Sequence, residues 1–160
     1  MNIGDFKETY LSLQKKHKLP DFEELNLGFD IGKIKRDSGN ILRDIRRIMI
    51  EKIVYYNKLV EVMINPSGAT PILLMLLKEI TSEDKKIIDS VLNSFVELEI
   101  ESHKLDVFSN EIGEVKLINR INDVWKNKKD EVMSLIGILE RNLKKTSAPV
   151  INKKNRDYFN

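Results

Sequence analysis

Residues 41–64, ILRDIRRIMIEKIVYYNKLVEVMI, decide the fold class. Apolar residues recur along this stretch at intervals of three and four, which places them on one wide arc of an α-helix. They are Ile41, Leu42, Ile45, Ile48, Met49, Ile53, Tyr56, Leu59, Val60 and Met63. Polar residues fill the opposite arc, Ser38 or Asn40 can cap the start, and Asn65-Pro66 ends it. The stretch therefore predicts a long central helix over residues 40–64.

Shorter helical patterns lie on the N-terminal side of this helix. Apolar residues spaced for one helix face predict a helix over about residues 4–18, and Pro20 marks its end. Pro20 is followed by Glu23 and Glu24, which favours the first turn of a second, short helix. Residues 27–39 hold three glycines and no sustained period, so we expect a connector there.

The C-terminal side predicts further helices. Thr70-Pro71 begins a short helix, ILLMLLKEI, whose apolar residues face all round; this favours a segment enclosed by the bundle, or a hairpin partner docked in a groove. Thr81 and the acids after it begin a long helix over residues 82–108. Two more helices are expected over about residues 111–127 and 128–144.

These elements predict an all-α fold, a five- or six-helix bundle with a long central helix and a C-terminal tail. No stretch alternates in the way that strands require. The bundle is expected to be one domain over residues 1–145, because 160 residues and a hydrophobic fraction of 41% suffice for a single core. Residues 146–160 form a basic-aromatic tail that ends in Tyr158, Phe159 and Asn160 and is expected to be disordered or to dock on its own bundle or on a partner.

The composition excludes several classes of protein. The chain has no cysteine, which excludes disulfides, thiolate metal sites and cysteine nucleophiles. Its longest apolar run, Ile72 to Leu77, is far shorter than the roughly 20 residues that span a bilayer. The first ten residues lack the apolar region of a signal peptide. We therefore predict a cytoplasmic protein with no membrane partner.

Charge is distributed unevenly although the net charge is only +2. Residues 1–78 carry 13 Lys/Arg and 10 Asp/Glu, residues 79–114 carry 3 and 10, and residues 115–160 carry 11 and 5. The favoured interpretation is that these segments pack side by side and neutralise one another through surface pairs. The alternative is that basic residues form one face of the protein that binds phosphate groups.

The densest basic cluster supplies the candidate residues for that alternative: Lys33, Lys35, Arg36, Arg43, Arg46 and Arg47. Guanidinium groups one helical turn apart can contact successive phosphates. Asp37, Asp44 and Glu51 lie close by, however, and no aromatic residues interleave for base stacking. A solvated face with i,i+4 pairs is the favoured interpretation.

Two charged residues fall inside apolar arcs. Lys52 lies near the middle of the arc of the central helix, and Glu99 lies on the apolar side of the 82–108 helix. Burying either ion alone would cost several kcal/mol, so each needs a partner or a route to water. One hypothesis is an interior Lys52–Glu99 pair that fixes the register of two long helices. The other is that each side chain extends outward to solvent along its own stem.

Glu99, His103 and Asp106 share one helix face at spacing i, i+4, i+7. Carboxylate and imidazole are ligand types for zinc or iron, which makes the three a weak metal candidate. Matching ligands from other helices are not evident, so we predict no metal, no cofactor and polar contacts between helices instead. Trp125 and the Tyr55-Tyr56 pair are expected at the core or its rim rather than in a ligand cage.

One resemblance to a known family covers about a third of the chain. The order of ILRDIRRIMIEKIVYY (41–56) and TSEDKKIIDSVLNSF (81–95) resembles the helical part of archaeal replication-complex GINS subunits, where a basic helix precedes an acid-started one. The C-terminus departs from that family, because it has no counterpart of the small β domain those subunits carry.

No catalytic motif is present, and this favours a non-enzymatic helical interaction module, an adaptor or complex subunit. Gly28 to Lys33 lacks the glycine spacing and the hydroxyl residue of a phosphate loop. A module of this kind predicts a protein partner and an exposed apolar patch or a groove at helix ends. The alternative is a nucleic-acid-associated accessory protein that uses the basic cluster at 33–47.

Overall fold

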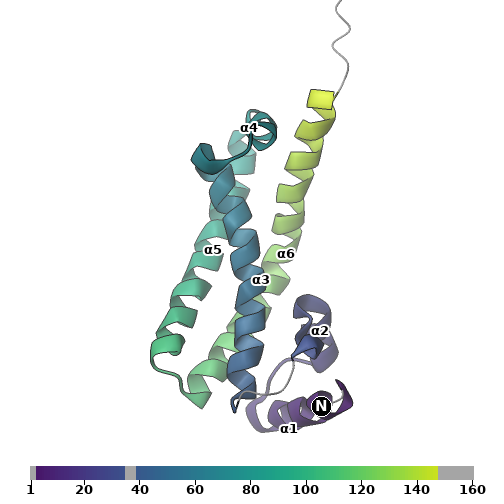
Figure 1. Cartoon of the computed structure of the whole chain (residues 1–160), viewed down its shortest axis with the longest axis vertical. Coiled ribbons are helices and arrows are strands. Elements are labelled where there is room, and N and C mark those ends of the chain that lie inside the picture. The colour runs from purple at the N-terminus through teal and green to yellow at the C-terminus, as the bar shows by residue number, and fades with distance from the viewer. Residues whose placement is uncertain (1–2, 35–38, 148–160) are drawn as a thin grey trace, which may run out of the picture.

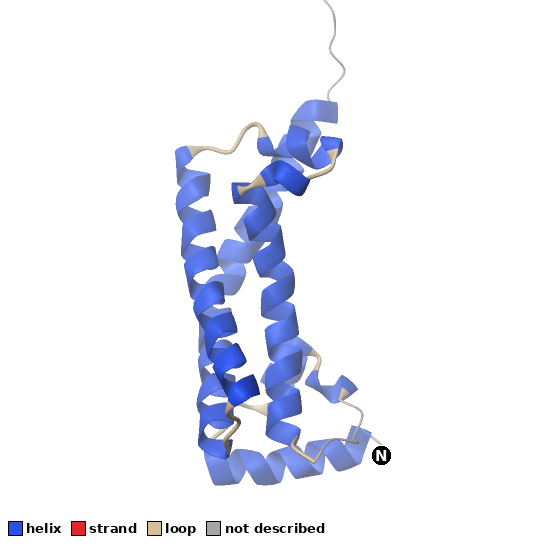
Figure 2. Ribbon diagram, turned by 60° about the vertical axis from the view of Figure 1, so that its left-hand side comes forward, coloured by secondary structure: helices blue, strands red, loops and turns tan. Residues whose placement is uncertain are grey.

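The computed structural model describes residues 3–34 and 39–147, and this part of the chain is almost entirely helical (Figures 1 and 2). Its elements, in chain order, are α1 (Ile3–His17), α2 (Phe22–Phe29), the 3-10 turn η1 (Ile31–Lys33), α3 (Ile41–Ile64), the 3-10 turn η2 (Pro66–Gly68), α4 (Pro71–Leu77), α5 (Ser82–Val107) and α6 (Glu111–Ser147). The described ranges contain six α-helices and no strand. The predicted all-α bundle of five or six helices is confirmed.

Three long helices, α3, α5 and α6, run side by side along the long axis and contact one another pairwise (Figure 1). Each presents a seam of residues spaced alternately by four and three, which is the spacing that keeps one stripe of a helix facing its neighbours. The seam of α3 is Leu42, Arg46, Met49, Ile53, Tyr56, Val60 and Met63; that of α5 is Asp84, Ile88, Val91, Phe95, Leu98, Ser102 and Leu105. The seam of α6 runs from Glu114 through Ile118, Ile121, Trp125, Lys128, Val132, Leu135 and Leu139 to Asn142.

The central part of these seams forms the hydrophobic core. Met49 and Ile53 from α3, Phe95 from α5 and Ile121 and Leu135 from α6 are fully buried. Removing this apolar surface from water drives the three helices together. Polar residues stand at or near the ends of the seams: Arg46, Ser102 and Glu114 at one end, and Asp84 and Asn142 at the other.

The lower end of the bundle is closed by α1, which lies across it, and by α2, which lies against α3 and α6 (Figures 1 and 2). Phe6 and Tyr10 of α1 pack on Phe22 of α2, with ring centroids 6.1 and 5.4 Å apart. The Tyr10 hydroxyl donates a hydrogen bond to the Pro20 carbonyl at 2.7 Å. This aromatic cluster fixes the turn between the two short helices.

The caps that the sequence predicts are present. Asn40 accepts a hydrogen bond from the backbone N–H of Arg43 at the start of α3. Thr81 and Asp84 form a reciprocal capping box at the start of α5. Such caps satisfy backbone donors that have no partner within the helix, so they fix where each helix begins.

Two predicted boundaries were wrong. The expected connector over 27–39 is in part helical, because α2 continues to Phe29 and Asn26 Oδ1 accepts from the backbone N–H of Gly32 to hold the η1 turn. The expected break between residues 127 and 128 does not occur, and α6 is one helix. Lys128 interrupts the apolar stripe there, but it stays in the seam by donating to Ser90 at 2.6 Å.

The expected enclosure of the 70–80 helix was also wrong. None of the residues of α4 is buried. The helix lies at the upper end of the bundle against α6 (Figure 1), where it has too few neighbours to cover an apolar surface that faces all round. Within the described residues no helix is long and apolar enough to cross a membrane. The predicted tail motif, Tyr158 and Phe159, lies outside the described residues.

Candidate functional site

A buried charged network joins the three long helices near the lower end. Arg46 of α3 and Glu114 of α6 are both fully buried, and Arg46 Nε donates to Glu114 Oε2 at 2.6 Å. The Arg46 guanidinium also donates to Ser102 Oγ at 2.5 Å and to Asp106 Oδ1 at 2.8 Å, both on α5. Ser109 completes the shell by donating to Glu114 Oε1 at 3.1 Å.

This network corrects the predicted basic face. Arg46 is 0% exposed and its side chain is satisfied inside the bundle, so it presents nothing to a phosphate. Arg43 and Arg47 both lie within 3.6 Å of Asp106, and Lys33 pairs with Asp30 at 3.0 Å. Lys35 and Arg36 lie outside the described residues. The described members of the cluster therefore all contact carboxylates: Lys33 contacts Asp30, and the three arginines share Asp106, with Glu114 as a further partner of Arg46.

Ion pairs of the same kind connect the other charged segments. Arg141 pairs with Asp84 at 2.8 Å, Arg120 with Glu97 at 2.6 Å, and Lys16 with Glu111 at 2.7 Å, while Lys145 pairs with Glu79. Each pair joins the acidic segment 79–114 to a basic segment. These contacts confirm the predicted neutralisation of the acidic middle by the basic ends.

The predicted Lys52–Glu99 pair does not form, and each residue has a different partner. Lys52 Nζ donates to the carbonyl of Gly28 in α2 at 2.5 Å. Glu99 Oε1 accepts from Asn57 Nδ2 of α3 at 2.7 Å. The reason is helical geometry: Lys52 and Asn57 are five residues apart, about 140° around α3, so one faces α2 and the other α5. The polar contact of α3 with Glu99 thus uses the buried Asn57 in place of Lys52.

The weak metal candidate does not gather as a ligand set. Asp106 faces the arginines of α3, and Glu99 faces Asn57. Among the residues that the structure describes, no group of three or more His, Asp or Glu side chains could hold a metal ion. Glu99, His103 and Asp106 share a helix face, as the spacing requires, but the neighbouring helices bring them nitrogen donors rather than further carboxylates.

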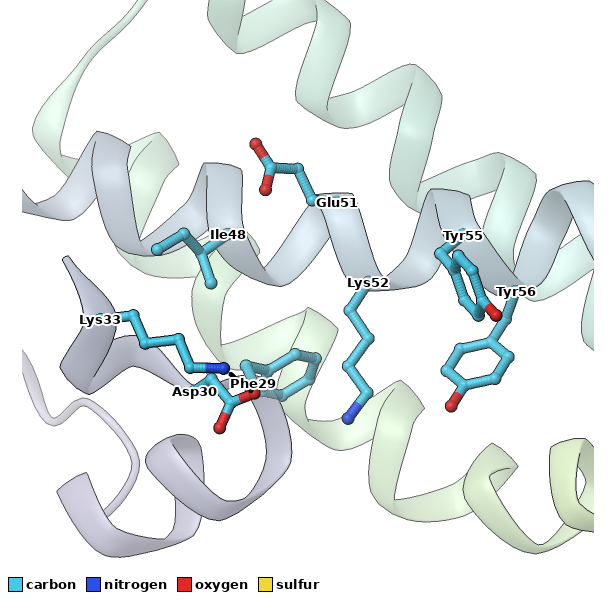
Figure 3. Close-up of a pocket in the computed structure, with 8 residues that line it drawn as sticks. All are labelled: Phe29, Asp30, Lys33, Ile48, Glu51, Lys52, Tyr55 and Tyr56. Atoms are coloured by element: carbon cyan, nitrogen blue, oxygen red, sulfur yellow. Dashed lines mark hydrogen bonds and ion pairs between the residues drawn. The ribbon is translucent and has the colours of Figure 1, made fainter.

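Lys52 lies at a cleft of about 530 Å³ between α2 and the middle of α3 (Figure 3). The cleft is lined by Phe29, Asp30, Lys33, Ile48, Glu51, Lys52, Tyr55 and Tyr56. Lys52 Nζ is 4.7 Å from the centroid of the Trp125 ring and 5.9 Å from that of Phe29. Half-burial lowers the pKa of Lys52, and the charge of Asp30 opposes that shift.

Trp125 and Phe29, which face this ammonium group, belong to a cluster of aromatic rings from three helices. Trp125 of α6 stacks on Tyr56 at 5.5 Å and packs on Phe29 at 5.8 Å, and Tyr55 meets Tyr56 edge to face at 5.1 Å. Trp125 and Tyr56 are partly buried at the core rim, as predicted. Tyr55 was expected there too, but it is 69% exposed.

The upper end of the bundle exposes apolar side chains on α4 and the end of α3. Ile72 is 68% exposed, Ile64 and Met75 are each 48% exposed, and Leu74 is 40% exposed. Beside them is a second cleft, of about 490 Å³, whose apolar lining is Met63, Ile64, Pro66, Leu77, Ile80 and Ile88. We call α4 together with this cleft the α4 surface.

Hydrogen bonds hold α4 in place without covering it. Asn142 of α6, which is 1% exposed, donates from Nδ2 to the carbonyl of Leu76 at 2.6 Å. Lys145 of α6 pairs with Glu79 just beyond the helix. The backbone of α4 is thus fixed to α6, while its apolar side chains remain in contact with solvent.

Comparisons with family models, with curated proteins and with solved structures found no match for this chain. The resemblance of residues 41–56 and 81–95 to GINS subunits therefore gains no support from them.

Proposed function

We propose that this protein is a non-enzymatic interaction module that binds a partner protein through the α4 surface. The observation that carries the proposal is that a helix of seven uncharged, mostly large apolar residues, Pro71–Leu77, has no buried member. Leaving such a surface in water is unfavourable, and contiguous apolar patches on folded proteins commonly mark protein contacts.

The chemistry of the α4 surface indicates the kind of partner. The cleft beside α4 is lined by apolar residues together with Lys78, Lys85 and Asp89. Among the described residues neither Lys78 nor Lys85 forms an ion pair, whereas the nearby Glu79 and Asp84 are neutralised by α6. An amphipathic helix with apolar anchors and acidic flanks fits this arrangement.

The test compares the proteins captured by matched variants of the full chain. Ile72→Ser and Met75→Ser alter the α4 surface, and Leu27→Ser alters an apolar side chain that is 90% exposed on α2. Each variant would be tagged and expressed in its native host, and captured proteins quantified by mass spectrometry. We expect the two α4 variants to lose one or more partners by at least about tenfold, because interface anchors dominate binding energy, and Leu27→Ser to retain them.

Two results would count against this proposal. Identical capture by all four proteins would show that no partner depends on α4. Sedimentation of the purified chain supplies the second: a stable dimer broken by Ile72→Ser would mean that α4 covers itself in a second copy.

A further inference from the structure

We propose that the cleft at Lys52 binds a small anion that carries a flat ring, with the acid group on Lys52 and the ring against Tyr55 and Ile48. This inference is independent of the α4 surface, since the cleft lies on the side of the bundle between α2 and α3 (Figure 3). Its volume of about 530 Å³ is within the range of small-molecule sites.

The charge of Lys52 favours an anionic ligand. None of the ion pairs formed by the described residues includes it, and its Nζ has one hydrogen-bond acceptor, the Gly28 carbonyl. The ring faces of Trp125 and Phe29 favour the ammonium form but do not neutralise it. A half-buried cation with two donor positions left to fill is stabilised by an anion that enters the cleft.

The two acidic residues that line the cleft do not form an ion pair with Lys52. Asp30 is paired with Lys33 at 3.0 Å. Glu51 projects from the opposite side of α3 from Lys52, away from the ammonium group, as Figure 3 shows. No carboxylate of the described residues therefore contacts the Lys52 ammonium group, and Asp30 acts on it only through its charge at a distance.

The side chains beside Lys52 favour a ligand that carries a flat ring. Tyr55 is 69% exposed at the mouth of the cleft, and Ile48 lines the cleft one helical turn before Lys52. A flat aromatic group can stack on an exposed tyrosine and cover apolar surface while its acid group reaches inward. An inorganic anion would leave these contacts unused, so a ring-bearing acid fits the cleft better.

A titration of the isotopically labelled chain by NMR can test this, because Trp125 is its single tryptophan and the labelled indole N–H gives one signal beside Lys52 to which the unlabelled probes do not contribute. Two pairs of probes separate charge from ring: indole-3-acetate with its neutral amide, and adenosine 5′-monophosphate with adenosine. We expect saturable shifts with at least one acid, and affinity at least about tenfold weaker for its neutral counterpart, as for loss of a hydrogen bond to a charged group. The better acid shows whether the cleft prefers carboxylate or phosphate.

Variants then locate the contact. Lys52→Met should weaken binding of the acid by about tenfold or more, while Lys58→Met, an exposed lysine on the same helix, should leave it unchanged. Tyr55→Ala changes an exposed residue and should weaken binding several-fold through loss of the ring contact. Because the acid–neutral comparison uses the unaltered chain, it decides the question even if Lys52→Met does not fold.

Three results would overturn the proposal. They are shifts that never saturate with either acid, equal affinity for acid and neutral probes, and unchanged affinity in a folded Lys52→Met protein.

Discussion

The two ends of the bundle treat charge and apolar surface in opposite ways. At the lower end Arg46 and Glu114 are charged and fully buried, each satisfied by partners from the other long helices. At the upper end the apolar residues of α4 are exposed, although two contacts from α6 hold the helix in place. Stability at the lower end is expected to depend on single side chains. The upper end is expected to tolerate substitution, which is what a binding surface requires.

The largest effect is expected at the buried pair. Glu114→Ala leaves Arg46 without its fully buried counter-ion, and breaking such a pair typically costs about 3–5 kcal/mol. Urea unfolding followed by circular dichroism measures this cost. Asp123→Ala, an exposed acid on the same helix, is the control and should change the free energy of unfolding by about 0.5 kcal/mol or less.

A double variant sharpens the interpretation of that loss. Arg46→Met with Glu114→Leu removes both charges, and replacing a buried pair by apolar residues is often neutral. We expect it to be more stable than Glu114→Ala alone. A cost below about 1 kcal/mol for Glu114→Ala would be typical of a surface ion pair. The stability of the lower end would then not depend on its buried charges, and the difference between the two ends would not hold.

A smaller effect is expected where α4 is fixed to α6. Asn142→Ala removes the buried donor to the Leu76 carbonyl, and loss of such a partly buried hydrogen bond typically costs about 0.5–1.5 kcal/mol. Hydrogen exchange should rise at the amides of α4 and remain unchanged in the core of α5. Asn127→Ala, an exposed position of α6, is the matched control. Unchanged exchange in α4 would show that apolar contacts, rather than this hydrogen bond, hold the helix.

The lower end should also respond to acid. The hydrogen bond from Arg46 holds the pKa of Asp106 below its ordinary value, with burial opposing the shift. As the pH falls, Asp106 therefore binds a proton at a higher pH in the unfolded chain than in the folded chain. The stability that the ionised Asp106 contributes is present above about pH 4, and it is lost as the pH falls through the lower pKa of the folded state.

Comparing Asp106→Asn with the unaltered chain between pH 7 and pH 2 measures the contribution. The variant should lose less stability on acidification, by under about 1 kcal/mol because Asp106 is 38% exposed. Asp123→Asn should follow the unaltered chain. If the stability of Asp106→Asn fell with pH in parallel with that of the unaltered chain, the arginines would not stabilise the ionised form of Asp106.

The sequence predicted the helices well because caps and apolar spacing are local signals. Asn40 and Thr81 cap the helices as expected. The break expected at 127–128 does not occur, because the spacing of Lys128 from Trp125 and Val132 keeps it in the seam. No glycine or proline stands there to end the helix.

The sites were harder to predict, since they depend on which helices become neighbours. Arg46 lies four residues after Leu42 and three before Met49, so its spacing places it in the seam of α3. Glu114 stands at the same kind of position relative to Ile118. That signal could have identified the buried pair in place of a basic face. The partners of Lys52 and the exposure of α4 follow from tertiary packing, which periodicity within one helix does not contain.

The smallest effect on stability is expected on the α4 surface itself. Ile72 is 68% exposed, so Ile72→Ala should change the free energy of unfolding by about 0.5 kcal/mol or less. Ile53→Ala makes the same chemical change at a fully buried position of α3 and should cost about 2–5 kcal/mol. A cost at Ile72 comparable to that at Ile53 would mean that α4 is part of the core in solution, and a helix buried there could not serve as a binding surface.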